Sequence, residues 1–553
     1  MTDTDKIVAT RPLPYFWPAV LILALAACML VLFATSGQGI GVSPDSVFYL
    51  EGAENLRAGR GYTSRQPGNV YAPITHWPPG YSFALTASSF GGEVLDAARR
   101  LNALLFALNV LLAGVIIRRL GGRDWAGLLA AALVATAPPM IELHTTAWSE
   151  PLFFTLALGA CACLASFRRN GRWAPLLLSA FLAGLSVVVR FAGAALVAAM
   201  LLALIAMLGS QSQFLLKRRL KAAAFTLVAL VPMSAWLISR GSGAAGASRK
   251  IGFLGLPTGQ HLSDAAHSMS VWLLPDEVPS WLRGGLLIVV ALLALAVCVQ
   301  VGRGLVRGWR NARPTDPADS ALRFIVLFAV CYAGLVVGSV VFLDPEIVFD
   351  SRTLSPLYVC SALAAPLPAA TQRNRRAVAA IAAAIMAMTI AGAARSALAA
   401  SAVNRDGLWL NSRAWRQSPI IARLNALPAN TLVFTNQIAA VRFLTKCDVL
   451  ATPPVLTTNR PDGGPPKVHP EYALRMRKVL QTVTSRGGAV ATFHAPEWYY
   501  GLSEEAQTGL LAAQVPAAAL DELAAIAQGG DLVEARNFEE GSFYVYAPPQ
   551  MTR

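Results

Sequence analysis

The uncharged stretch PYFWPAVLILALAACMLVLFAT, residues 14–35, determines the class of fold. A helix needs roughly 20 mostly apolar residues to cross a bilayer, and this stretch provides them. Its apolar run is too long for a cleavable signal peptide, and more apolar runs follow it. We therefore predict a first membrane-spanning helix that remains in the mature protein.

Ten further apolar stretches follow along the chain. They cover residues 101–117, 125–140, 151–167, 174–189, 191–208, 222–239, 284–302, 324–343, 354–370 and 377–397. The 553 residues are 55% hydrophobic and 14% charged, whereas soluble domains average about 45–50% apolar and about 25% charged residues. This composition excludes a soluble enzyme, a disordered chain and a fibrous protein. The expected fold is mainly α: a polytopic helical membrane protein with about 11 spans.

Basic residues are distributed unevenly between the two sides of these spans. If the N-terminus is cytoplasmic, the cytoplasmic segments hold 20 basic and five acidic residues. This excess equals the formal net charge of +15, and it follows the rule that Lys and Arg collect on the cytoplasmic side. An odd number of spans then places the C-terminus outside, in a bacterial inner (plasma) membrane protein. The net charge therefore indicates orientation and no nucleic-acid partner.

Three segments on the outer side are long enough to form structure of their own: residues 36–99, residues 240–283 and the chain after about residue 400. We expect a transmembrane domain over residues 1–400, including the first outer loop 36–99. A separate extracytoplasmic domain is expected over residues 401–553.

The C-terminal domain has an ordinary composition with strand and helix patterns in alternation. Strand-like runs are TLVFTN (431–436), DVLATP (448–453), AVATFHA (489–495) and SFYVYAP (542–548), and helical patterns fit near 415–427, 437–446, 470–486 and 504–528. These patterns predict a small α/β domain. It contains no phosphate-binding glycine motif, and PDGGPP (461–466) is predicted to be a loop.

Charged residues gather at the outer ends of several predicted spans, where each needs a physical reason. Asp45 follows the first span and Glu150 begins the fourth. Arg190 separates two apolar runs, and Asp350 and Arg352 precede the tenth span. Plainer interpretations are a helix cap for Asp45, a boundary residue that reaches toward water for Arg190, and an ion pair between Arg352 and Asp350. Because these groups converge on one face from four loops, we predict a functional site there.

Aromatic residues of the first outer loop are suited to line such a site at headgroup level. The segment His76-Trp77-Pro78-Pro79-Gly80-Tyr81 is rigid and aromatic, and Tyr49 lies on a helix expected along the interface. The predicted substrate-lining residues are Tyr49, Trp77, Tyr81 and Asp350. Glu142 and His144 are expected to be surface groups.

Metal and redox sites have little support in the sequence. The chain has seven cysteines without a CxxC pair, which favours core-filling side chains. Asp344, Glu346 and Asp350 offer the oxygen ligands that divalent cations prefer, but carboxylates spaced in this way within one loop are more often solvated. We expect no metal and no cofactor, with a divalent cation as the alternative.

Five segments together resemble the GT-C superfamily of membrane glycosyltransferases. They are SPDSVFYLEGAENLRAGRGY (43–62), HWPPGYSFALTASSFGG (76–92), AWSEPLFF (147–154), GLSVVVRFAG (184–193) and FDSRTLSPLYV (349–359). The similarity is to the bacterial relatives of protein mannosyltransferases and of the lipid A aminoarabinose transferase. It covers residues 10–400 in layout and is most specific in the first loop.

The resemblance implies roles for particular residues. The catalytic carboxylate of the family falls on Asp45, although many members have Asp-Glu where this chain has Asp-Ser. A second acidic position matches Glu150, and the family's two arginines match Arg190 and Arg352. The position of His76 corresponds to a polar residue near the donor phosphate. The family usually has Arg-Tyr where this chain has Arg-Thr at residues 352–353.

The resemblance also implies a reaction. Because nucleotide sugars are cytosolic, an outward-facing transferase needs another donor, here a polyprenyl-phosphate sugar. Asp45 is suited to deprotonate the acceptor hydroxyl, and Arg190 and Arg352 are suited to bind the departing phosphate. We expect inverting transfer of a hexosyl or pentosyl group to a lipid, glycan or protein, as in lipopolysaccharide modification.

Two other functions remain open at this stage. A flippase or transporter for a lipid-linked glycan typically has internal repeats and charges at the bilayer midplane, and neither is evident here. A glycan polymerase or ligase would use two lipid-linked glycans and would place its loops on the same face.

Overall fold

The computed structural model describes residues 15–121, 123–207, 215–240, 252–311, 317–371, 374–453, 456–457, 467–468, 472–493, 532–538 and 541–546. The chain forms two compact units. The first comprises Met1–Ile40 and Thr75–Gly407, and the second comprises Gly41–Ile74 and Leu408–Arg553. This division differs from the predicted one at residue 400, because half of the first outer loop packs with the C-terminal residues.

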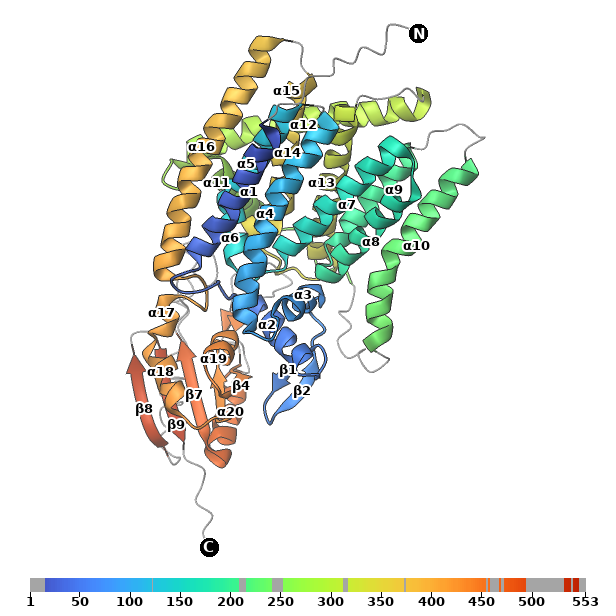
Figure 1. The fold of residues 1–553 in the computed structure, drawn as a ribbon. Coiled ribbons are helices and arrows are strands. Elements are labelled where there is room, and N and C mark those ends of the chain that lie inside the picture. Colours follow the sequence, from blue (N-terminus) through green and yellow to red (C-terminus); the bar gives the residue numbers. More distant parts are fainter. Residues whose placement is uncertain are drawn as a thin grey trace, which may run out of the picture. The chain divides into compact units, whose positions relative to one another are not determined.

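The first unit is a bundle of helices (Figure 1). They are α1 (Phe16–Ala34), α3 (Gly80–Ser88), α4 (Val94–Gly121), α5 (Asp124–Ala135), α6 (Pro138–Thr145), α7 (Glu150–Asn170), α8 (Trp173–Val189), α9 (Gly193–Met207), α10 (Leu215–Arg240), α11 (Gly259–Leu273), α12 (Ser280–Asn311), α13 (Pro317–Phe342), α14 (Ser351–Ala364), α15 (Leu367–Thr371) and α16 (Arg375–Asp406). Each of the predicted spans overlaps one or two of these helices. A mainly helical, multi-pass membrane fold is thereby confirmed.

Several predicted spans are shorter or more broken than an ideal membrane helix. Among the described residues, seven helices are long and apolar enough to cross a membrane, or eight if the bent pair α5 and α6 forms one span. The two helices of that pair meet at 58°, because two prolines begin α6 and lack the backbone N–H that would continue α5. Helices α8 and α9 contain 17 and 15 residues, with Arg190 between them.

Glycines allow close approach between neighbouring helices of the bundle. A Cβ atom on Gly127 of α5 would lie 2.5 Å from the Gly114 carbonyl oxygen of α4. A Cβ on Gly184 of α8 would lie 2.2 Å from the Ala229 carbonyl oxygen of α10. Without a hydrophobic driving force in lipid, this close packing of small residues holds membrane helices together.

The second unit combines part of the first outer loop with the C-terminal residues. The loop contributes α2 (Pro44–Arg57) and the hairpin of β1 (Thr63–Gln66) and β2 (Val70–Pro73). The C-terminal part contains α17 (Arg413–Arg416), α18 (Pro419–Ala426), β3 (Leu432–Thr435), α19 (Ile438–Leu444), β4 (Asp448–Ala451), β5 (Leu456–Thr457), β6 (Lys467–Val468), α20 (Tyr472–Arg486), β7 (Gly488–Phe493), β8 (Leu532–Phe538) and β9 (Gly541–Tyr546).

A five-stranded mixed sheet forms the centre of this unit, in the order β4-β3-β7-β9-β8. Strands β4, β3 and β7 are parallel, and β9 and β8 continue the sheet antiparallel. Val479 and Val483 of α20 share a buried cluster with Phe434, Val490 and Tyr546 of the sheet.

The four predicted strands occur as β3, β4, β7 and β9, and three of the four predicted helices occur as α18, α19 and α20. The predicted helix at 504–528 and the predicted loop at 461–466 lie outside the described residues. Strand β8 was not predicted, because its sequence LVEARNF alternates only weakly. Edge strands tolerate such charged residues since one side lacks a partner strand.

Candidate active site

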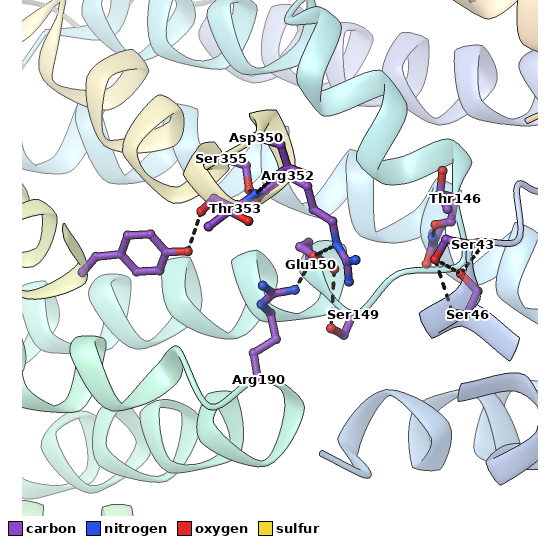
Figure 2. A network of polar contacts seen from close by, with 12 residues as sticks. Ser43, Ser46, Thr146, Ser149, Glu150, Arg190, Asp350, Arg352, Thr353 and Ser355 are labelled. Carbon is purple, nitrogen blue, oxygen red and sulfur yellow. Dashed lines mark hydrogen bonds and ion pairs between the residues drawn. The ribbon is translucent and has the colours of Figure 1, made fainter. Parts of the chain in front are cut away.

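A buried carboxylate, Glu150, lies at the centre of the candidate site. It is the first residue of α7, where a negative charge is favoured by the helix dipole. Its side chain is only 1% exposed, and its Oε1 atom pairs with Arg190 Nη1 and accepts a hydrogen bond of 2.5 Å from Arg352 Nε. Figure 2 shows Glu150 between the two arginine side chains. Three separate segments of the first unit therefore meet at one carboxylate.

A break between two helices places Arg190 at this site. Arg190 follows the last residue of α8 in an extended conformation, with φ −148° and ψ 133°. Gly193 then begins α9, and a Cβ there would lie 2.5 Å from backbone atoms of Ser186 and Val187. The chain can turn this tightly only with glycine at that position. Arg190 is therefore an ion-pair partner of Glu150 within the bundle, and not merely a boundary residue.

The first turn of α14 holds Arg352. The Asp350 side chain caps this helix by accepting a 2.7 Å hydrogen bond from the Thr353 backbone N–H. The Tyr332 hydroxyl donates to the Thr353 carbonyl oxygen at 2.6 Å. The guanidinium of Arg352 lies over the Trp148 ring, 4.4 Å from its centroid. The plainer interpretation of the sequence was a pair between Arg352 and Asp350, whereas the structure pairs Arg352 with Glu150.

Within the trio of Glu150, Arg190 and Arg352 the positive charges outnumber the negative one. Glu142 interacts electrostatically with Arg352 and Asp350 at the edge of this cluster. Two guanidinium groups share one carboxylate, and both arginine side chains are 21% exposed while Glu150 is closed off. Each guanidinium has five N–H donors in a planar fork that matches phosphate or carboxylate oxygens. A second anion that approaches the exposed side would therefore meet a preorganised cationic site. This arrangement is suited to bind a phosphate group.

A buried hydrogen-bond network supports the start of α7. The Asn109 amide on α4 donates to the Pro151 carbonyl oxygen and contacts His144 Nε2, both at 3.1 Å, and it accepts from the Thr155 hydroxyl at 2.8 Å. His144 Nδ1 lies 2.6 Å from the Met140 carbonyl oxygen. A neutral imidazole with its proton on Nδ1 satisfies all of these contacts.

His144 is fully buried, so the expectation of a surface group was wrong. Its ring stacks on Phe106 of α4 with centroids 4.2 Å apart. The signal that could have revealed this network is Asn109 itself, a polar residue in the middle of an apolar run.

An apolar pocket begins one helical turn from the cationic cluster. It is lined by Phe153 and Phe154 of α7 and Pro356 of α14, which follow Glu150 and Arg352 by three or four residues. Along α7 it reaches Arg168, a distance of about 22 Å at 1.5 Å per residue. Its remaining walls come from α4, α9 and α13. The pocket has a volume of about 70 Å³, and its walls are almost entirely apolar.

The other predicted site residues occupy different surroundings. His76 is exposed and lies beside Trp77, with ring centroids 5.4 Å apart. Tyr81 is fully buried, and its hydroxyl donates to Asn102 Oδ1 at 2.9 Å. Asp350 is exposed beside the cluster.

Asp45 and Tyr49 both lie on α2 in the second unit. Asp45 is partly exposed in the first turn of that helix, and Tyr49 is 2% exposed. The helix is capped by a reciprocal pair, because Ser43 and Ser46 each accept a hydrogen bond from the other's backbone N–H. The cap itself is therefore Ser43, and Asp45 follows it within the helix.

No group of three potential metal-ligating residues forms within the part of the chain that the structure describes. All seven cysteines are free thiols, and none is fully exposed.

Comparisons with known proteins give one family and one fold. Residues 76–238 match the dolichyl-phosphate-mannose-protein mannosyltransferase family. Among solved structures, ArnT from Cupriavidus metallidurans bound to undecaprenyl phosphate has a TM-score of 0.51 at 13% identity, over 96% of this chain and 98% of that one. The same protein in the apo state has a TM-score of 0.50 at 12% identity, over 95% and 97%. A comparison with curated proteins gives no match.

This likeness extends over both units and establishes the fold. The resemblance to GT-C membrane glycosyltransferases that the sequence indicated is therefore confirmed. The matched family covers α3 to α10, which includes Glu150 and Arg190. The family matched over residues 76–238 is one of mannosyltransferases, and the solved structures show the likeness of fold.

Proposed function

We propose that this protein transfers a sugar from a polyprenyl-phosphate donor to an acceptor hydroxyl on the outer face of the membrane. The observation that carries the proposal is the cluster of Glu150, Arg190 and Arg352, in which two guanidinium groups share one carboxylate about one helical turn from an apolar pocket. A lipid phosphate combines the two features that this site would bind, an anionic head and a hydrocarbon tail. ArnT, which shares the fold, has been solved with undecaprenyl phosphate.

In this mechanism the acceptor oxygen attacks the anomeric carbon as the bond to the phosphate oxygen breaks. Asp45 takes the acceptor proton, and a positioned base of this kind contributes roughly 10²–10⁴ in rate. Arg190 and Arg352 stabilise the charge that develops on the departing polyprenyl phosphate. Glu150 holds both guanidinium groups in place. A single displacement inverts the anomeric configuration, by analogy with inverting glycosidases.

The remaining predicted residues have supporting roles in this proposal. We propose that His76 and Trp77 contact the donor phosphate and the sugar, and that Tyr49, Tyr81 and Asp350 line or support the substrate site. The transferred group is a hexosyl or pentosyl unit, and the acceptor is a lipid, a glycan or a protein. In this proposal the arginines supply the positive charge at the leaving phosphate, and no metal or other cofactor is required.

The orientation proposed for the chain follows from its basic residues. The excess of Lys and Arg in alternate loops supports a cytoplasmic N-terminus and a C-terminal unit outside the bacterial inner membrane. A donor on this side must be lipid-linked, which agrees with the choice of donor.

Vesicles of both orientations separate this proposal from its alternatives. The full-length protein is reconstituted, and a polyprenyl-phosphate monosaccharide is supplied from one side together with cell-envelope membranes as the source of acceptor. Release of free polyprenyl phosphate, only from the side that exposes the C-terminal unit, is expected. Movement of the intact lipid across the bilayer without release would instead indicate a flippase. Turnover only with two lipid-linked oligosaccharides would indicate a polymerase or ligase.

A further inference from the structure

Helix α2, which carries Asp45, is attached at two points to the C-terminal part of the second unit. Before the helix, Val42 pairs with Trp409 as a parallel bridge, and the Leu410 N–H donates to the Val42 carbonyl oxygen at 2.9 Å. Within the helix, the Phe48 ring lies under the guanidinium of Arg442, 5.6 Å from its centroid. Asp45 stands three residues from each attachment.

Arg442 of α19 is the hub of the second attachment. Its Nη2 atom donates to the Arg65 carbonyl oxygen, and its Nη1 atom lies 3.7 Å from Glu51 Oε2 on α2. Glu51 Oε1 in turn accepts a 2.5 Å hydrogen bond from the Arg65 backbone N–H. Arg442 thus contacts α2 through both Phe48 and Glu51, and it also contacts the hairpin that follows α2.

The hairpin has its own ion pair with the C-terminal sheet. Arg65 of β1 reaches Asp448 Oδ1 of β4 at 2.7 Å and Asn430 Oδ1 at 2.5 Å. The other oxygen of Asp448 accepts from the Gly68 N–H at 2.8 Å, at the tip of the hairpin. These partners are separated by more than 360 residues in the chain, so the contacts exist only in the folded unit.

The attachment is buried and balanced in charge. The side chains of Arg442 and Glu51 are each 16% exposed, and that of Asp448 is 10% exposed. Burial raises the pKa of Glu51 above its ordinary value, although Arg442 and Arg65 oppose this shift and Glu54 adds to it. Charges removed from water in this way are costly to leave without a partner. Removal of one partner from this junction is therefore expected to cost more than removal of one partner from an exposed surface ion pair.

We propose that the C-terminal part serves to position α2 and its carboxylate Asp45, with Arg442 as the main positioning residue. This inference rests on the proposed role of Asp45 as the base. A base acts only within hydrogen-bond reach of the proton that it takes, so rotation or sliding of α2 lowers turnover. Arg442 acts through α2 and touches no reacting atom.

Kinetics of matched variants test this role. Arg442→Gln removes the hub, whereas Arg413→Gln removes an exposed arginine of α17 in the same unit as a control. Arg442→Gln should lower kcat on the order of 10- to 100-fold, the cost of roughly 1 Å of misplacement, while KM for the donor stays within about 2-fold. Arg442→Lys should recover part of kcat, because it keeps the charge but not the planar fork. Arg413→Gln should behave as wild type.

A double-variant cycle distinguishes action through Asp45 from a general loss of structure. If Arg442 acts by placing Asp45, Arg442→Gln should change turnover by less than about 2-fold when Asp45→Asn is already present. Losses that multiply would overturn the proposal, because they would show that Arg442 acts independently of Asp45. Equal kcat for Arg442→Gln and wild type would also overturn it.

Hydrogen–deuterium exchange of the full-length protein gives a readout that does not depend on catalysis. The amides of residues 47–57 in α2 should exchange faster in Arg442→Gln than in Arg413→Gln or wild type. Unchanged exchange in α2 would refute the attachment even if transfer is observed. If α2 exchanges faster in Arg442→Gln but the Asp45→Asn variant is fully active, the attachment is upheld and the proposed function is refuted.

Discussion

Substitution of Arg352 tests the proposed phosphate site most specifically. Arg352→Gln removes one of the two guanidinium groups at Glu150, and Glu150 keeps its ion pair with Arg190. The fold should therefore survive. A hydrogen bond to a charged group contributes about 1.5–3 kcal/mol, and each 1.4 kcal/mol is tenfold. The loss of one guanidinium–phosphate contact should lower kcat/KM for the donor roughly 10- to 140-fold.

The double variant Arg190→Gln/Arg352→Gln should behave differently. It leaves Glu150, at 1% exposure, without either of these cations. Breaking a buried ion pair from one side costs about 3–5 kcal/mol. The double variant should therefore lose more free energy of unfolding than the two single variants predict by addition, since each single variant retains one partner.

The assay for both predictions is transfer in lipid nanodiscs, with thermal unfolding followed by tryptophan fluorescence. Arg376→Gln, at an exposed position near the start of α16, is the matched control and should behave as wild type. An Arg352→Gln protein that is folded and has wild-type kcat/KM for the donor would refute the assignment. Strictly additive losses of stability would refute the shared-carboxylate arrangement.

Three further predictions follow from the same structure. Because burial raises the pKa of Glu51, the folded state binds more protons than the unfolded state above about pH 4.5. The free energy of unfolding of the second unit should therefore fall with pH until the raised pKa is passed. Glu51→Gln should remove this decline, and identical pH profiles for variant and wild type would contradict the argument. Asn109→Leu leaves the buried His144 Nε2 without its hydrogen-bond partner, at a cost of about 1–3 kcal/mol, whereas Thr155 and the Pro151 carbonyl keep the bond between them. Its unfolding temperature should fall well below that of wild type, and an unchanged temperature would show that the network contributes little. Gly193→Ala would place a Cβ 2.5 Å from backbone atoms of Ser186 and Val187. It should displace Arg190, three residues earlier, and so lower kcat/KM for the donor. Gly334→Ala is the control, because no atom lies within 4 Å of the added Cβ, and it should leave kcat/KM unchanged. Equal kcat/KM values for Gly193→Ala and Gly334→Ala would contradict the packing argument.

Much of the candidate site could be predicted from the sequence because its residues are charged and stand at the ends of apolar runs. Glu150, Arg190 and Arg352 attract notice for that reason, since a charge near lipid needs a purpose. Their convergence on one carboxylate could not be predicted. Pairing between helices depends on tertiary packing and leaves no local pattern, and the only local partner available to Arg352 was Asp350.

The boundary of the second unit could not be predicted either, because it also depends on contacts between segments that are distant in sequence. Order along the chain predicts that the first outer loop belongs to the membrane domain, because it follows the first span. Its pairing through Arg65 and Asp448 joins residues 383 positions apart, and no periodicity records such a contact. The strands β3, β4, β7 and β9 were predictable because each is a short apolar run bounded by turn residues.

Turnover of a lipid-linked sugar is the most direct test of the proposed reaction. Purified wild type and Asp45→Asn in nanodiscs would be given polyprenyl-phosphate hexoses and pentoses, with cell-envelope membranes as the source of acceptor, and the release of polyprenyl phosphate would be measured. The wild type should release it with transfer of the sugar, and Asp45→Asn should be slower by roughly 10²–10⁴ while remaining folded. Equal rates for the two proteins would contradict the proposed mechanism.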